Sequence, residues 1–143
     1  IEPLHENDLQ QFDHYTSSEI EKFVIRSADS QKYIEDDEHF NSNSIINYLD
    51  ELVLHQKAFK PQIPHHTGFG LSLLKGKSAH IHSYELDSSE AFLCLDGKWE
   101  ITCDDQKVVI GPRDTFSAPK NSIRSLKQIS DQEGSLFLIR QKN

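Results

Sequence analysis

Three side chains near the middle of the chain are of types that bind metal ions in proteins. His80 and His82 are separated by one residue, and Glu90 opens a later β-prone run. Alternate side chains of a β-strand share a face, so the two histidines are expected to point the same way. Two imidazoles and one carboxylate around an open position form a facial triad that holds a divalent metal such as iron(II). The spacing therefore predicts His80, His82 and Glu90 as metal ligands.

These residues must be positioned by strands. From Phe69 onward short β-prone runs alternate with turn signals, a pattern typical of an all-β sandwich or barrel. The predicted strands cover residues 70–74, 79–82, 91–95, 99–103, 107–110, 115–118, 123–129 and 135–139. We expect residues 68–143 to form a β-barrel and residues 1–67 to form an N-terminal extension that packs on it, within one structural domain.

The extension contains two predicted elements. Residues 21–25 suggest a short strand. Residues 44–55 carry apolar side chains at helical spacing, with Ser44 available as an N-cap, and predict one short helix. These apolar residues are Ile45, Ile46, Leu49, Leu52 and Val53.

The pair Asp96-Gly97 predicts a two-residue hairpin turn between two neighbouring strands. In that hairpin Cys94 faces Trp99 and Glu90 faces Cys103, so the cysteines are not opposite each other and a disulfide is not expected. Two buried thiols fit a reducing compartment, and we expect the protein to be cytoplasmic.

One face of this predicted hairpin is apolar and aromatic. Counted from Glu90, the inward side chains are Phe92, Cys94, Trp99, Ile101 and Cys103. Such a wall either lines a small-molecule pocket or fills the barrel, and the sequence leaves both readings open. The opposite face carries Ala91, Leu93 and Leu95, which must also be covered. A homodimer is one way to cover them.

Composition excludes several classes of function. The chain has 143 residues and a formal net charge of −8, so it lacks the basic balance of a nucleic-acid-binding protein. No apolar run approaches the roughly 18 residues of a membrane span. The first residues do not have the pattern of a signal peptide. We expect neither a nucleic acid nor a membrane as partner.

Two blocks carry a family resemblance. Glu90–Gly97 reads EAFLCLDG and Asp114–Arg124 reads DTFSAPKNSIR. Together they resemble the two motifs of the cupin superfamily, whose fold is a double-stranded β-helix or jelly roll. Residues 68–72 (GFGLS) and 111–119 (GPRDTFSAP) resemble small single-domain bacterial cupins of the RmlC-like type, whose functions are largely unassigned. In metal-binding cupins the ligands are the two histidines of H-x-H, the motif-one Glu and a motif-two His. The resemblance therefore implies a site for Fe, Ni, Mn or Zn.

The chain departs from this pattern in two places. Seven residues separate His82 from Glu90, where cupins have three or four. Either the intervening loop is longer, or Ser83 and Glu85 take the ligand positions. The motif-two histidine position is Arg124, which stays protonated and cannot ligate a metal. Arg124 could pair with Glu90, clamp an anionic ligand or point outward.

Two functions that involve a small molecule remain open from the sequence, beside a third possibility, an interaction module whose flat apolar face is the functional surface. The first is a metal-dependent cupin, dioxygenase-like or isomerase-like, that acts on a small organic acid. The second is a metal-free ligand-binding or sensor cupin with a Glu90–Arg124 pair in the barrel and no catalysis. In both, an anionic small molecule is the expected partner. Its predicted contacts are Arg124, Trp99, Phe92 and Cys94.

Overall fold

The described part of the chain is built from β-strands. The computed structural model describes residues 21, 24–26, 32–36, 40–54, 57–61 and 68–141. Within these ranges the ordered elements are β1 (Lys32–Asp36), β2 (Phe40–Leu49), β3 (Leu52–Leu54), β4 (Lys57–Phe59), β5 (Phe69–Gly76), β6 (His80–Glu85), β7 (Glu90–Asp96), β8 (Trp99–Cys103), β9 (Gln106–Ile110), β10 (Thr115–Ala118), β11 (Ile123–Gln128) and β12 (Gly134–Gln141). The predicted all-β class is confirmed, and all eight predicted barrel strands are present as β5 to β12.

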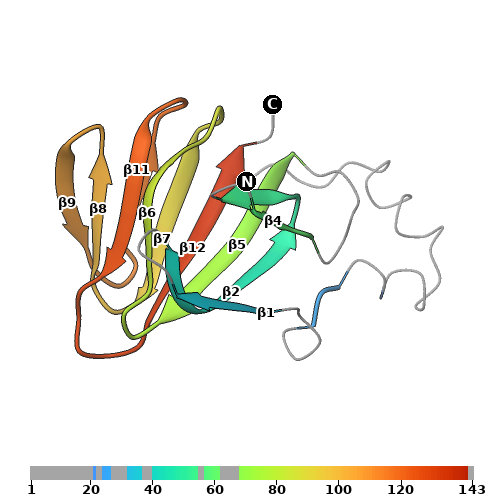
Figure 1. The fold of residues 1–143 in the computed structure, drawn as a ribbon, viewed down its shortest axis with the longest axis horizontal. Coiled ribbons are helices and arrows are strands. Elements are labelled where there is room, and N and C mark those ends of the chain that lie inside the picture. The colour runs from blue at the N-terminus through green and yellow to red at the C-terminus, as the bar shows by residue number, and fades with distance from the viewer. Residues whose placement is uncertain are drawn as a thin grey trace, which may run out of the picture.

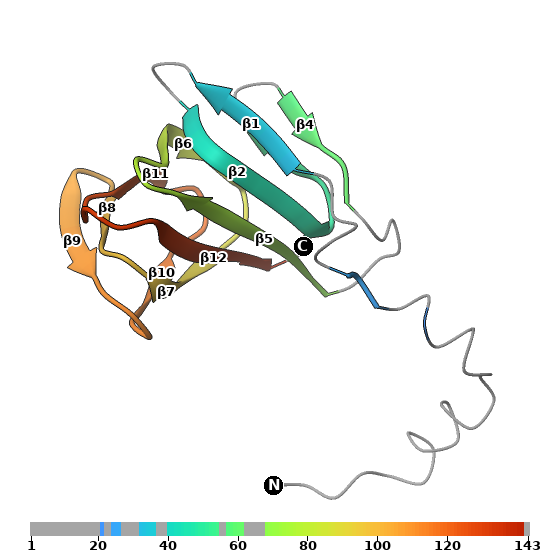
Figure 2. The same ribbon diagram turned by 90° about the horizontal axis from the view of Figure 1, so that it is seen from below.

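The strands form two halves that β2 joins. The hydrogen-bonded order is β10-β7-β12-β5-β2-β6-β11-β8-β9, and all the pairs are antiparallel. β2 pairs with β5 through residues 44–49 and with β6 through residues 40–41, so it passes from one half to the other. Figure 1 labels the strands of both halves, and Figure 2 shows β2 lying between β5 and β6. The outcome is a jelly roll, as predicted.

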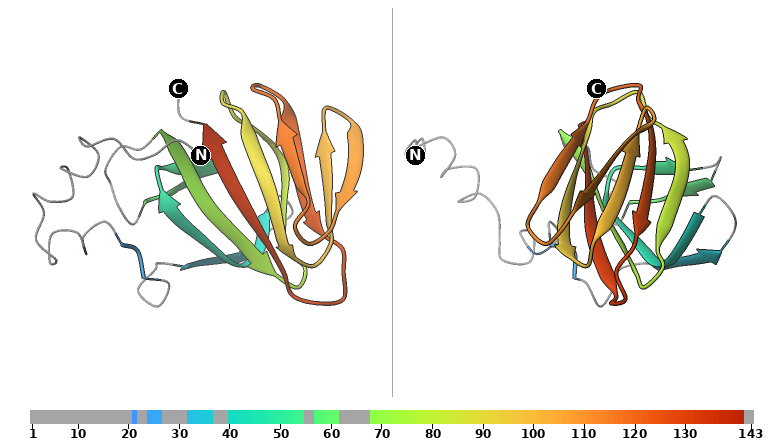
Figure 3. Two further views of the ribbon diagram at one scale, coloured as in Figure 1. Left: turned by 180° about the vertical axis from the view of Figure 1, so that it is seen from behind. Right: turned by 90° about the vertical axis from the view of Figure 1, so that its left-hand side faces the viewer.

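The core lies between the two halves. Alternate residues of the strands face inward, and apolar side chains from both halves become fully buried there. The largest of them are Trp99, Phe92, Ile45, Leu74, Ile81, Ile101, Leu126, Leu136 and Leu138. Figure 3 shows the two groups of strands from behind and from the side.

The predicted hairpin at Asp96-Gly97 is wrong. β7 pairs with β10 and β12, whereas β8 pairs with β9 and β11, so the turn carries the chain from one half to the other. Gly97 has a φ of 84°, and a Cβ at this position would lie 2.9 Å from the Cα of Gly134. The indole Nε1–H of Trp99 closes the turn by donating to the Asp96 carbonyl over 3.1 Å. Both cysteines are free, as expected.

The predicted helix over residues 44–55 is also wrong, because this segment contains the end of β2 and all of β3. Ile45 faces the core and is fully buried, while Ile46 on the other face is 4% exposed. A central strand that is covered on both faces carries consecutive apolar residues, and these imitate helical spacing. The register also shifts between Asn47 and Leu49, which disturbs the two-residue alternation.

Other expectations for the N-terminal half have mixed outcomes. Of the predicted strand at 21–25, residues 21, 24 and 25 are described and belong to no strand, and residues 22 and 23 lie outside the described residues. In the part of the chain that the structure describes, no helix is long and apolar enough to cross a membrane. The domain division at residue 67 and the homodimer stay predictions.

The strand assignment of β2 and β3 can be tested by two alanine substitutions. Ile45→Ala should lower the free energy of unfolding by about 2–5 kcal/mol, because it opens a cavity in the core. Val53→Ala should change it by less than about 0.5 kcal/mol, since Val53 is 49% exposed. A helix with both residues on its apolar face would lose stability at both positions. Urea unfolding of the two variants measures the difference.

Candidate functional site

The two cupin-like motifs meet in a buried ion pair. A guanidinium nitrogen of Arg124 on β11 lies 3.0 Å from Oε1 of Glu90 on β7, and both side chains have no exposed surface. The hydroxyl of Tyr84 on β6 donates to the same oxygen over 2.7 Å. Of the three predicted orientations of Arg124, the inward pair with Glu90 is therefore the one that the structure contains.

Arg124 is also bonded to the loops at this end of the barrel. Its Nε–H donates to the hydroxyl of Ser122, and Nη2 donates to the carbonyls of Ser88 and Pro119, each over 2.8 Å. A buried cation needs this number of acceptors, because desolvation of an unpaired charge costs several kcal/mol. The guanidinium thus fixes the loops before β7 and β11 and leaves little donor capacity for a ligand.

Burial sets the protonation of the groups around this pair. Desolvation raises the pKa of Glu90, and it outweighs the opposing effects of the Tyr84 hydroxyl and the Arg124 charge. Burial, and then the adjacent Glu90, raise the pKa of Tyr84 well above its usual range, so the phenol remains a donor. The second carboxylate oxygen of Glu90, Oε2, is buried without a hydrogen-bond partner among the described residues.

A second guanidinium lies in the same interior. Arg140 on β12 is 5% exposed, and it donates to the hydroxyl of Ser72 over 3.1 Å and to Oδ1 of Asn47 over 3.4 Å. Burial lowers the pKa of Arg140, while the charges of Glu90 and Asp50 oppose this shift. The polar interior therefore combines two cations with the nearby carboxylates of Glu90 and Asp50.

His80 and His82 lie on the other side of the sheet from Glu90. A β-bulge places His82 and Ser83 together opposite Ser125, and Ser83 has a φ of 56°. The bulge interrupts the alternation of faces, so Ile81 and Tyr84 both point inward. Neither predicted alternative describes this register: the histidines point out of the barrel, and Ser83 and Glu85 are exposed as well.

The residues present do not fit a metal ion inside the barrel. The structure does not bring His80 and His82 together with Glu90. The Oε1 atom of Glu90 already accepts hydrogen bonds from Tyr84 and Arg124, and a guanidinium at this distance repels a metal cation. Within the described ranges, no group of three His, Cys, Asp or Glu side chains is arranged to hold a metal.

The predicted apolar ligand contacts are packed into the core. Phe92, Cys94 and Trp99 have no exposed surface, and the ring of Phe92 stacks on Phe116 with centroids 6.3 Å apart. None of them, nor Arg124, borders the three surface hollows described for the molecule. In this structure these side chains fill the barrel, and their role in ligand binding stays a prediction.

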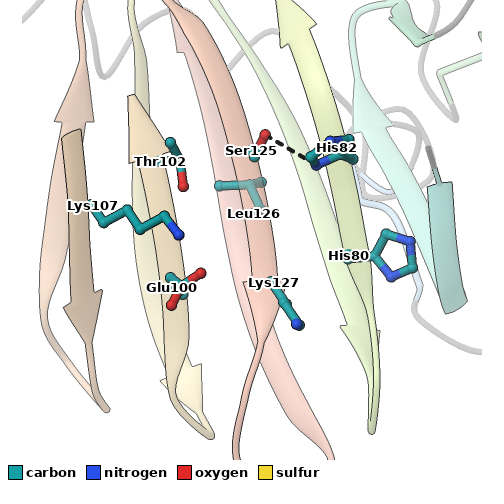
Figure 4. Close-up of a pocket in the computed structure, with 8 residues that line it drawn as sticks. All are labelled: His80, His82, Glu100, Thr102, Lys107, Ser125, Leu126 and Lys127. Carbon is teal, nitrogen blue, oxygen red and sulfur yellow. Dashed lines mark hydrogen bonds between the residues drawn. The ribbon is translucent and has the colours of Figure 1, made fainter. Parts of the chain in front are cut away.

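The largest of the three hollows is a groove of about 450 Å³ on the outer face of β6, β11, β8 and β9. Figure 4 shows its side chains, which project from the four neighbouring strands. They are His80, His82, Glu100, Thr102, Lys107, Ser125, Leu126 and Lys127. We call this the outer groove. Both histidines of the sequence motif thus belong to a site that lies outside the barrel.

Strand register arranges the outer groove in two rows. One row runs from His80 through Lys127 to Glu100, and the other from His82 through Ser125 and Thr102 to Lys107. The hydroxyl of Ser125 lies 3.5 Å from Nδ1 of His82 and accepts the backbone N–H of Ser83. The groove therefore presents two ammonium groups, two imidazoles and two hydroxyls around one carboxylate.

Among the described residues, the two lysines of the outer groove, Lys107 and Lys127, have no ion-pair partner. The whole chain has a net charge of −8, so a groove with two unpaired ammonium groups is locally more positive than the protein as a whole. The groove can attract an anion and bond it with several donors.

Sequence reasoning missed Tyr84, Arg140 and the polar side chains of β8, β9 and β11. Tyr84 reaches Glu90 because of the bulge, which has no clear sequence signal. A signal did exist for the groove: Glu100, Thr102, Lys107, Ser125 and Lys127 are polar residues on predicted strands. The wrong hairpin pairing placed β8 beside β7, whereas its neighbours are β9 and β11.

Comparison with known proteins identifies the fold. No protein-family profile matches the chain, and no curated protein matches it. One similar solved structure is the cupin domain of Schizosaccharomyces pombe Cnp3, with 14% identity and a TM-score of 0.57 over 85% of this chain and 74% of that one. A second is an RmlC-like cupin from Shewanella frigidimarina, with 10% identity and a TM-score of 0.59 over 85% of this chain and 91% of that one. A third is the polyketide cyclase RemF from Streptomyces resistomycificus, with 10% identity and a TM-score of 0.62 over 82% of this chain and 78% of that one. The chain therefore has the cupin fold, as the two motifs predicted.

The buried pair should behave as a coupled unit. Arg124→Met should lower the free energy of unfolding by about 3–5 kcal/mol, because it leaves Glu90 buried without a cation. The double variant Glu90→Gln/Arg124→Met should lose less than the two single variants added together. Additive losses in urea unfolding would contradict the coupling.

The raised pKa of Glu90 gives a pH dependence with a definite sign. A carboxyl group that ionises less readily when folded stabilises the protein below its unfolded pKa of about 4.5. That contribution is lost as the pH rises through the higher folded pKa. The wild type should therefore lose stability relative to Glu90→Gln as the pH rises above about 4.5. A constant difference between the two proteins from pH 4 to 7 would argue against this shift.

Proposed function

We propose that this protein is a small-molecule-binding cupin that holds a small organic anion in the outer groove, without a metal and without catalysis in the barrel. The observation that carries the proposal is the pair of unneutralised lysines in a groove with hydroxyl and imidazole groups. Lys107 and Lys127 come from different strands, β9 and β11, and border the same hollow.

The state of the barrel interior supports placing the ligand outside. Glu90 and Arg124 form an ion pair through Oε1, and the apolar side chains around them are fully buried. An anion that entered the interior would have to displace the Arg124–Glu90 contact, and breaking such a pair is costly. An anion in the outer groove displaces only water, and exchanges it for charge-assisted hydrogen bonds.

The chemistry of the lining also supports a small organic acid rather than a neutral apolar ligand. Six of the eight lining residues carry ammonium, imidazole or hydroxyl groups: His80, His82, Lys107, Lys127, Ser125 and Thr102. The seventh is the carboxylate of Glu100, and Leu126 is buried beneath the groove. Such a lining gives specificity through directed polar contacts and little through apolar area.

Titration calorimetry with succinate and methyl phosphate tests the proposal. The double variant Lys107→Ala/Lys127→Ala should bind both anions at least about tenfold more weakly, a loss of about 1.4 kcal/mol. The affinity of the wild type for both anions should fall when the salt concentration is raised from 20 to 200 mM, because salt screens exposed charges.

The matched control is Lys98→Ala/Lys120→Ala, which removes the same charge from exposed positions that do not border the groove. The control should bind like the wild type. An equal loss of affinity in the two double variants would show that the effect comes from net charge alone, and it would overturn the proposal. Absence of binding by the wild type would overturn it as well.

A further inference from the structure

Glu100 gives the outer groove an acceptor among its donors. It lies on β8, is half-buried, and is the one carboxylate among the described residues that line this hollow. Strand pairing places it beside Lys127, yet no side chain of the described residues forms an ion pair or hydrogen bond with it. This carboxylate weakens the binding of a simple anion to the two lysines. A ligand hydroxyl would donate to it.

The neighbouring side chains extend this pattern. Thr102 follows Glu100 along the same face of β8, and Ser125 lies opposite Thr102 on β11. Figure 4 shows Lys107 reaching from β9 over β8, between Thr102 and Glu100. One ammonium group, one hydroxyl and one carboxylate thus face the same part of the groove. A ligand that fits it has an anionic group and a hydroxyl group close together.

The size and polarity of the groove define the ligand further. Four adjacent strands span about 14 Å at roughly 4.8 Å per spacing, and the hollow has a volume of about 450 Å³. This is room for one phosphate group together with several hydroxyls. None of its lining residues is Phe, Tyr or Trp, and the rings that border it are the imidazoles of its two histidines.

We infer that the outer groove binds a phosphorylated polyol, whose phosphate accepts hydrogen bonds from Lys107, Lys127 and the nearby hydroxyls. The polyol hydroxyls donate to the carboxylate of Glu100. This inference rests on the proposed anion-binding function and names the class of ligand. Glu100 has two effects: it favours the hydroxyls of the ligand and disfavours an anion that brings no donor.

The two effects of Glu100 can be separated with two monoesters of equal charge. Glucose 6-phosphate carries hydroxyls, whereas methyl phosphate has the same phosphate group and no hydroxyl. Calorimetry at 20 mM salt should show that the wild type binds glucose 6-phosphate about tenfold more tightly than methyl phosphate, because hydrogen bonds to a charged group are the strong ones.

In Glu100→Gln the preference for glucose 6-phosphate should shrink to less than about threefold, while methyl phosphate should bind more tightly than to the wild type. The matched control is Glu85→Gln, which removes one negative charge from an exposed position of β6 that does not border the groove. The control should keep the tenfold preference.

The outcomes distinguish the two proposals. If both esters bind equally well and binding still depends on the two lysines, the inference about the polyol is wrong and the anion site remains. If Glu100→Gln weakens methyl phosphate as much as glucose 6-phosphate, the role assigned to Glu100 is wrong. If neither ester binds to the wild type, both proposals fall.

Discussion

The end of the barrel depends on one buried ion pair. Glu90 belongs to the half of the barrel with β7, and Arg124 belongs to the half with β11, so their contact joins the two halves. Neither charge can stay buried without the other, because each would face the full cost of desolvation. Tyr84 from β6 and the carbonyls of Ser88 and Pro119 complete the set of partners. Three strands and two loops thereby meet around a single guanidinium.

This pair joins the two cupin-like motifs of the chain. The glutamate of the first motif and the residue at the histidine position of the second motif still meet inside the barrel. With an arginine at position 124, Oε1 of the glutamate accepts hydrogen bonds from a guanidinium and from the phenol of Tyr84. The two motif positions thus stabilise the barrel through hydrogen bonds between its strands and loops. The polar side chains of the outer groove lie on the outer face.

A single bulge links the interior to the outer groove. Because His82 and Ser83 share one partner across the strand pair, the faces of β6 change over at this point. Tyr84 then points inward and can donate to Glu90, while both histidines point outward beside Ser125 and Lys127. A regular strand could not place Ile81 and Tyr84 on the same face, because they are three residues apart. The interior network and the outer groove therefore depend on the same irregularity.

The sequence by itself determined the all-β class, the positions of β5 to β12 and the likeness to the cupin fold. These follow from local signals, namely the alternation of apolar residues, the turn-forming pairs and the spacing of two motifs. It also indicated that Arg124 cannot ligate a metal and that an inward Arg124 would pair with Glu90.

Tertiary structure alone decided the pairing of the strands and the faces of the key side chains. The Asp96-Gly97 turn joins two halves of the barrel, and no local signal distinguishes such a turn from a hairpin. Ile45 and Ile46 belong to a strand covered on both faces, which has the same apolar pattern as a helix. His80 and His82 lie outside because a register shift of one residue moves side chains to the opposite face of a sheet. That register depends on strands that are distant along the chain, so the outer groove emerged only from the fold.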